Sequence, residues 1–175
     1  NVETIIHIYD AVVNGRPCID RVVTVSGDGI MNPGNFKVPL GMNQQELVNV
    51  AGGFQGTPEK IVSGGPMMGF AMFTLDVPVT KTSSSILCMT KDEVAKYEPS
   101  ACINCGRCIE ACPSRLIPSR LADYAERHDE AAFEKEFGVE CMECGSCSYV
   151  CPAKRQLKQA SSSMRKTVLA NRKKK

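Results

Sequence analysis

The spacing of hydrophobic residues changes along the chain and separates a helix from a region of short strands. Apolar residues at positions 5, 8, 9, 12 and 13 share one helical face, which predicts a helix from about Val2 to Val13. Asn1 is its expected cap, and Asn14-Gly15 ends it. Residues 20–93 carry short β-branched runs between turn residues, which predicts strands.

The strand region has one helix-like interruption. Asn43 and Glu46 form a cap-like start, and Gly52-Gly53 end the short helix that follows. A hairpin, one helix and further strands predict a small α+β domain, specifically a β-grasp. The loop at residues 64–69 is either a tight turn or a segment that presses on a neighbouring domain or cofactor. The expected strands are residues 21–26, 36–39, 61–62, 77–80 and 86–89.

Helical spacing returns after residue 94. Pro118 suits the first position of a helix, and Asp129 is the expected cap of a second one. Phe133 and Phe137 are expected on one side of this second helix, with Gly138 at its end. Residues 157, 160, 164 and 168 continue the helical spacing. The second half is therefore predicted to be mainly helical.

Eight of the ten cysteines form two copies of one pattern, C-x2-C-x2-C-x3-C followed by Pro. This spacing is a known ligand run of two-cluster ferredoxins, in which the fourth cysteine of each run binds the other cluster. The pattern predicts two [4Fe-4S] clusters. The expected ligands are Cys102, Cys105, Cys108 and Cys151 for cluster 1, and Cys141, Cys144, Cys147 and Cys112 for cluster 2.

Other uses of these cysteines fit the spacing less well. Structural zinc sites usually pair two separated C-x2-C units, and a redox C-x-x-C motif needs only two cysteines. Disulfides would require a secreted chain. The remaining Cys18 and Cys88 lie in apolar stretches and are expected to be buried free thiols. Together these features indicate a reducing, intracellular compartment.

The charge of the chain is unevenly distributed. Its net charge is +2, yet residues 154–175 hold nine of the 21 Lys and Arg residues and no acid. The other 12 basic residues therefore stand against all 19 acidic ones. A basic end of this kind suits an anionic membrane surface or an acidic partner. Aromatic residues do not interleave with it, which argues against nucleic acid as a partner.

The chain shows no apolar run of membrane-spanning length and no signal peptide. It lacks an initiator Met, so we expect a fragment of a longer polypeptide. No P-loop, G-x-G-x-x-G or nucleophile motif is present, so no catalytic residue is expected. The predicted organisation is a helix that follows a missing flavin and NADH domain (1–16), a β-grasp domain (17–93), a dicluster domain (94–158) and a basic C-terminal tail (159–175).

Four stretches give the chain a resemblance to the C-terminal part of the RnfC family, the C subunits of the Rnf electron-transport complexes. NVETI (1–5) resembles the end of the family's flavin domain, and VSGDGIMNPGNFKVPLG (25–41) resembles its soluble-ligand-binding β-grasp (SLBB) domain. GGPMMG (64–69) with VPVTKTSSSIL (77–87), and CMECGSCSYVCPAKRQL (141–157), are similar to RnfC in particular.

The resemblance implies an activity and its location. Rnf complexes are ferredoxin:NAD oxidoreductases coupled to Na+ or H+ translocation, and this segment would relay electrons within one. The implied partners are the membrane-embedded and ferredoxin-like Rnf subunits, and the implied place is the cytoplasmic face of the membrane. FMN and NAD(H) would belong to the missing N-terminal domain. Asn1 and Thr4 match an Asn-x-x-Thr that touches flavin in a related family, and the alternative role of both residues is helix capping.

Three alternatives remain open. The same modules occur in other iron–sulfur flavoproteins, such as cobalamin reductases. The β-grasp domain is a candidate ligand-binding module, in which case the clusters would be structural. The basic tail is also a candidate nucleic-acid contact.

Overall fold

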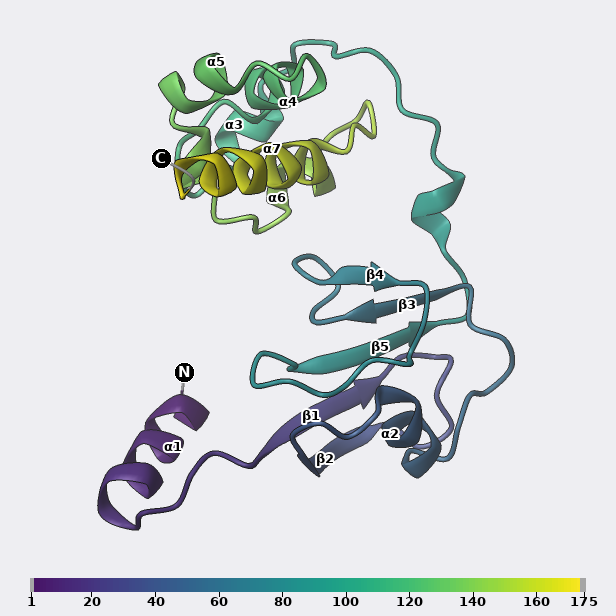
Figure 1. Ribbon diagram of the computed structural model, residues 1–175. Coiled ribbons are helices and arrows are strands. Elements are labelled where there is room, and N and C mark those ends of the chain that lie inside the picture. Colours follow the sequence, from purple (N-terminus) through teal and green to yellow (C-terminus); the bar gives the residue numbers. More distant parts are fainter. Residues whose placement is uncertain (1, 174–175) are drawn as a thin grey trace. The chain divides into compact units, whose positions relative to one another are not determined.

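The computed structural model describes residues 2–173, and the chain divides into two units between Asp92 and Glu93 (Figure 1). We call them the sheet unit and the helical unit. In the described range, every helix is too short or too polar to cross a membrane. The predicted α+β class, with strands first and helices after them, is confirmed.

The sheet unit is built on one five-stranded sheet in the order β2-β1-β5-β3-β4. β1 pairs parallel to β5, with Thr24 opposite Ser85, and the other neighbours are antiparallel. The neighbours β1 and β5 are therefore far apart in the sequence. The strands are β1 (Asp20–Ser26), β2 (Gly34–Pro39), β3 (Lys60–Ser63), β4 (Phe70–Met72) and β5 (Ser85–Met89).

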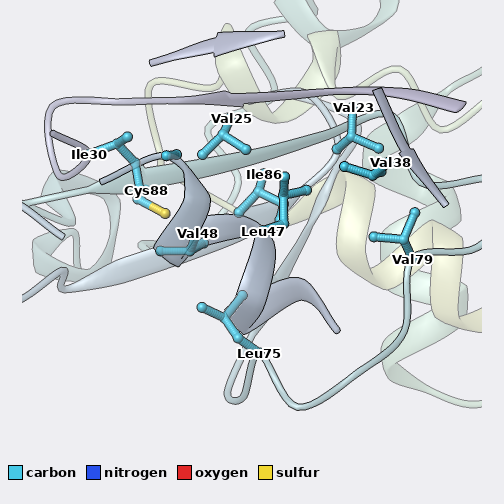
Figure 2. Close-up of a cluster of buried hydrophobic side chains, with 11 residues drawn as sticks. Val23, Val25, Ile30, Val38, Leu47, Val48, Leu75, Val79, Ile86 and Cys88 are labelled. Carbon is cyan, nitrogen blue, oxygen red and sulfur yellow. The ribbon is translucent and has the colours of Figure 1, made fainter. Parts of the chain in front are cut away.

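The hydrophobic core of the sheet unit lies between the sheet and helix α2 (Gln44–Val50) (Figure 2). Val23 and Val25 alternate with more exposed residues along β1, so one face of the strand is buried. Leu47 and Val48 of α2 cover that face, and each fully buried side chain of this kind contributes about 1.5–3 kcal/mol. Asn43 caps α2 as predicted, because its side chain accepts a hydrogen bond from the Gln45 backbone N–H at 2.8 Å.

Two strand predictions differ from the structure. Residues 77–80 form no strand: Pro78 makes only an isolated bridge with Asn43, and Val79 exchanges hydrogen bonds with Gly41 and Met42. Pro78 cannot donate to a ladder, which limits strand pairing here. Conversely, β4 was not predicted, since its three residues follow the Gly-rich loop directly.

Helix α1 (Val2–Val13) forms where predicted, but its apolar stripe is exposed. Ile5, Ile8 and Tyr9 are all more than half exposed, and no described residue of α1 is buried. A hydrogen-bonded ion pair between Glu3 and Arg21, at 2.8 Å, links the helix to β1.

The helical unit packs its two longest helices, α4 and α7, against each other. Its core contains Leu116, Leu121, Phe133, Met164 and Val168. Pro118 occupies the first position of α4, as predicted. The helices are α3 (Arg107–Glu110), α4 (Pro118–Glu126), α5 (Glu130–Lys135), α6 (Ser146–Tyr149) and α7 (Leu157–Arg172), with 3-10 turns η1 (Glu93–Lys96) and η2 (Gly138–Glu140).

One side of α5 was predicted incorrectly. Asp129 does cap this helix, accepting from the Ala132 N–H at 2.9 Å, and Phe133 is fully buried. Phe137 is instead 68% exposed. The helix ends at Lys135, and Phe137 adopts a left-handed conformation (φ 58°) that turns the chain into η2.

Candidate metal centres

Two hollows in the helical unit collect the eight motif cysteines in two sets of four. The first hollow, of about 530 Å3 including space open to solvent, is lined by Cys102, Cys105, Cys108 and Cys151. The second hollow, of about 390 Å3 on the same basis, is lined by Cys112, Cys141, Cys144 and Cys147. Each hollow thus holds three cysteines of one motif and the last cysteine of the other.

The two motifs share one backbone conformation at an offset of 39 residues, the distance from Cys102 to Cys141. Short helices α3 and α6 occupy matching positions and contact each other. The hydrogen bond from the Cys112 N–H to the Ile109 carbonyl, at 3.1 Å, recurs from Cys151 to Ser148 at 3.3 Å. The chain therefore builds the same loop twice.

Left-handed residues bend each loop around its hollow. Gly106 and Gly145, with φ of 76° and 85°, precede α3 and α6, and this conformation favours glycine. Non-glycine residues also adopt it at matching places, namely Asn104 with Glu143 (φ 55° and 57°), and Arg115 with Lys154 (φ 54° and 53°). Such residues cost about 1–2 kcal/mol each.

The linings combine thiols with apolar side chains. Ile103, Ile109 and Leu157 line the first hollow, and Leu116, Leu121 and Met142 line the second. A hydrogen bond from the Leu116 N–H reaches the sulfur of Cys112 at 3.4 Å. Proteins usually adjust the reduction potentials of iron–sulfur clusters through backbone hydrogen bonds to the ligand sulfurs and through apolar surroundings.

The residues that line the two hollows fit an iron–sulfur cluster by their chemistry. All ten cysteines have free thiols. Within residues 2–173, no group of three or more His, Cys, Asp or Glu side chains is close enough to hold one metal ion. A [4Fe-4S] cluster is held by four cysteine thiolates, and each hollow is lined by four cysteines.

The thiols of the two hollows differ in burial. Cys102 and Cys105 are exposed, whereas all four cysteines of the second hollow are half-buried. Burial raises the pKa of Cys141, and it raises the pKa of Cys147 to about 11. A hydrogen bond with Ser146, at 3.5 Å, lowers the pKa of Cys144. The second hollow is the less hydrated one.

Arg155 also lines the first hollow, although the sequence motifs did not predict it as a site residue. One of its nitrogens donates to Asp123 and to Glu126, both at 2.8 Å. Burial lowers the pKa of Arg155, but these two carboxylates more than reverse this effect, and the net result is a raised pKa. The guanidinium therefore stays charged. The 39-residue offset is the sequence signal that reveals its place, because it pairs Arg155 with Leu116 of the second hollow.

The arginines near the C-terminus are paired with acids inside the helical unit. Arg165 contacts Glu143 at 3.2 Å, and Arg172 contacts Glu134 at 2.6 Å. Arg155 is paired as described above. Lys166 and Lys173 are exposed to solvent.

The two expected flavin contacts lie away from the cysteines in sequence. Asn1 falls outside the described residues. Thr4 is exposed on α1 and lines a shallow hollow of the sheet unit together with His7, Arg21 and Lys81. Thr4 belongs to the sheet unit, whereas all eight motif cysteines belong to the helical unit.

Comparisons with protein families match both units. Residues 22–71 match the SLBB domain, and residues 101–155 match the 4Fe-4S dicluster domain.

Curated relatives match most of the chain. It is 47% identical over 139 residues to the C subunit of the proton-translocating ferredoxin:NAD(+) oxidoreductase complex of Clostridium ljungdahlii, covering 79% of this chain and 30% of that protein. It is 40% identical over 174 residues to the C subunit of the Na(+)-translocating ferredoxin:NAD(+) oxidoreductase complex of Acetobacterium woodii, covering 99% of this chain and 39% of that protein. It is 41% identical over 134 residues to the C subunit of the ion-translocating oxidoreductase complex of Yersinia pestis, covering 75% of this chain and 22% of that protein. The matched region thus spans well under half of each relative.

Proposed function

Because the chain belongs to the RnfC family, the C subunits of the Rnf ion-translocating oxidoreductase complexes, and contains an SLBB domain and a 4Fe-4S dicluster domain, we propose that it is the electron-relay segment of such a subunit. The observation that carries this proposal is the sorting of eight cysteines into two hollows of four, each completed by the other motif. In this assignment residues 17–93 form the β-grasp domain, residues 94–158 the dicluster domain and residues 159–175 the basic tail.

The cysteines hold the clusters in the proposed sites. Cys102, Cys105, Cys108 and Cys151 are the ligands of cluster 1, and Cys141, Cys144, Cys147 and Cys112 are those of cluster 2. When bound, the clusters supply one-electron redox chemistry. The left-handed turns at Gly106 and Gly145 aim the loops around the ligands, and the apolar side chains limit access of water.

The redox partners belong to the complex as a whole. By its likeness to the named relatives, the complex is proposed to exchange electrons between ferredoxin and NAD while it moves Na+ or H+. FMN and NAD(H) are assigned to the N-terminal part of the subunit, with Thr4 and Asn1 as the nearest candidate flavin contacts of this segment. The remaining Rnf subunits, membrane-embedded and ferredoxin-like, are its proposed partners.

The proposed location is the cytoplasmic face of the cell membrane, where the segment binds peripherally. Support comes from the translocating complexes to which the relatives belong and from the exposed Lys166 and Lys173. Lysines near an anionic leaflet contribute about 1 kcal/mol each to membrane binding. The arginines of the same segment are already paired with acids and add less.

A second candidate function is ligand binding by the sheet unit, with clusters that are only structural. An open groove is lined by Gln44 and several Ser and Thr residues, and its volume is about 1260 Å3 including space open to solvent. Gln44 is only 4% exposed, and its amide oxygen is buried without a hydrogen-bond partner. A ligand with an N–H or O–H group would satisfy this oxygen.

A redox titration followed by EPR separates the two functions. Electron relay predicts that both clusters are reduced reversibly within the range bounded by ferredoxin and NAD. Clusters that remain in one oxidation state throughout that range would support the structural role instead. Co-purification of membrane subunits with the tagged full-length protein then distinguishes an Rnf complex from a cobalamin reductase built of similar modules.

A further inference from the structure

The two hollows correspond residue by residue at the 39-residue offset, which makes their differences informative. The cysteines, the glycine of each loop, and Pro152 with Pro113 match in residue type. Three pairs differ in charge: Arg155 corresponds to Leu116, Asn104 to Glu143, and Ser119 to Lys158. The sites have the same frame but different electrostatic surroundings.

The first hollow has one charged lining residue, and it is a cation. The Arg155 side chain is 12% exposed and is fixed by Asp123 and Glu126, neither of which lines the hollow. Those carboxylates are 44% and 60% exposed, so solvent screens them more than it screens the guanidinium. The matching Leu116 is apolar and 8% exposed.

The second hollow carries charges of both signs. Glu143 lines it, and its carboxylate accepts from Ser162 at 2.6 Å and from Arg165 at 3.2 Å. Lys158 lines it as well, so the two lining charges offset each other. Among the lining side chains, the first hollow therefore has an unopposed cation and the second does not. The ion-pair partners Asp123 and Glu126 of Arg155, and Arg165 of Glu143, lie outside the two linings.

The cysteines of the first hollow are also more exposed to water than those of the second. Two of the four cysteines of the first hollow are exposed, but none of the second hollow is. Water stabilises the additional negative charge of a reduced site, and solvent exposure is one of the factors that set cluster potentials. Charge and hydration therefore favour reduction of the same site.

We propose that the site at Cys102, Cys105, Cys108 and Cys151 has the higher reduction potential of the two, and that Arg155 and Glu143 set this order. The inference rests on the proposed cluster ligation. Each site gains one electron and one negative charge from a low-potential one-electron donor, and no bond or proton changes place. Electrons that enter the segment collect at the first hollow and leave from it to a higher-potential acceptor.

The test is an EPR-monitored redox titration of the anaerobically prepared chain and its variants. Wild type is expected to show two separate midpoint potentials. Arg155→Met lowers the higher one by about 59 mV, a tenfold change in the reduction equilibrium, and leaves the lower one in place. Arg155→Lys keeps the charge but alters the hydrogen bonds, so it retains the wild-type value.

Two further variants keep the inference falsifiable if Arg155→Met loses its first cluster. Glu143→Gln is expected to raise only the lower potential, and Leu116→Arg to raise it as well. Equal potentials in wild type, a shift of both potentials by Arg155→Met, or equal shifts by Arg155→Lys and Arg155→Met would overturn the inference. Iron and sulfide analysis comes first, and a chain without two clusters would refute the proposed function itself.

Discussion

Cys112 and Cys151 exchange places: each lines the hollow that holds the first three cysteines of the other motif. They lie two residues beyond the ends of short helices α3 and α6, which contact each other. Neither motif therefore completes its own set of four thiols. Assembly of either site depends on the folding of both motifs together.

The exchange predicts which cysteines act as a set. Cys151→Ser is expected to reduce bound iron to about half, with the same residual EPR signal as Cys105→Ser, because both changes damage the first hollow. Cys112→Ser should instead leave the other signal. Cys18→Ser is the matched control and should retain all iron, since Cys18 lies in the sheet unit. Cys151→Ser and Cys144→Ser leaving identical signals would contradict the exchange.

Gly138 is expected to tolerate no side chain. A Cβ at this position would lie 2.5 Å from Cδ1 of Phe133, whose side chain is fully buried. Gly138→Ala should lower the free energy of unfolding by about 1–3 kcal/mol through overpacking. Urea unfolding measures this effect. Gly65→Ala is the control, because a Cβ there meets no atom within 4 Å, and equal losses for both variants would refute the account.

Asp28 gives the sheet unit a dependence on acid pH. Hydrogen bonds from the Thr90 hydroxyl and from its backbone N–H, the latter at 3.0 Å, lower the pKa of Asp28 from its ordinary 3.8. Because the folded pKa is the lower one, the stabilisation is complete above the unfolded pKa and is lost as pH falls through the folded pKa. Between about pH 5 and 3, the melting temperature of wild type should fall more steeply than that of Asp28→Asn. Parallel slopes would contradict this assignment.

The exposed lysines of the basic segment carry the proposed membrane contact. Replacing Lys166 and Lys173 together by Gln should weaken binding to phosphatidylserine vesicles by about 2 kcal/mol, and added salt should reduce the difference. Lys135→Gln is the control for lost charge, since it lies on α5 outside this segment. Vesicle co-sedimentation that is equal for all variants would rule out the contact.

Periodicity predicted the elements whose signal is local. The helix at residues 2–13 and strand β1 follow from their spacing, and the cap of α2 follows from Asn43. Residues 77–80 were mistaken for a strand because Val and Thr favour strands, whereas the position of Pro78 beside the Asn43 loop is a tertiary feature. β4 is three residues long, too short for any period to register.

The sites were predictable in a different way. The cysteine spacing predicted the two crossed sets of four that line the hollows, because this spacing is a known ligand run of two-cluster ferredoxins. The surroundings of the cysteines were not predictable, since Arg155 lies in the loop before α7 and is held beside the first hollow by Asp123 of α4. The left-handed turn at Glu143 likewise has no signature in residue type, whereas Asn104 belongs to a residue type that is enriched in this conformation.

The most direct test of the account is the iron and acid-labile sulfide content of the anaerobically purified chain. Two cubane clusters predict about eight irons and eight sulfides per chain, with no stoichiometric zinc. Zinc bound in place of iron, or disulfides among the eight motif cysteines, would contradict it.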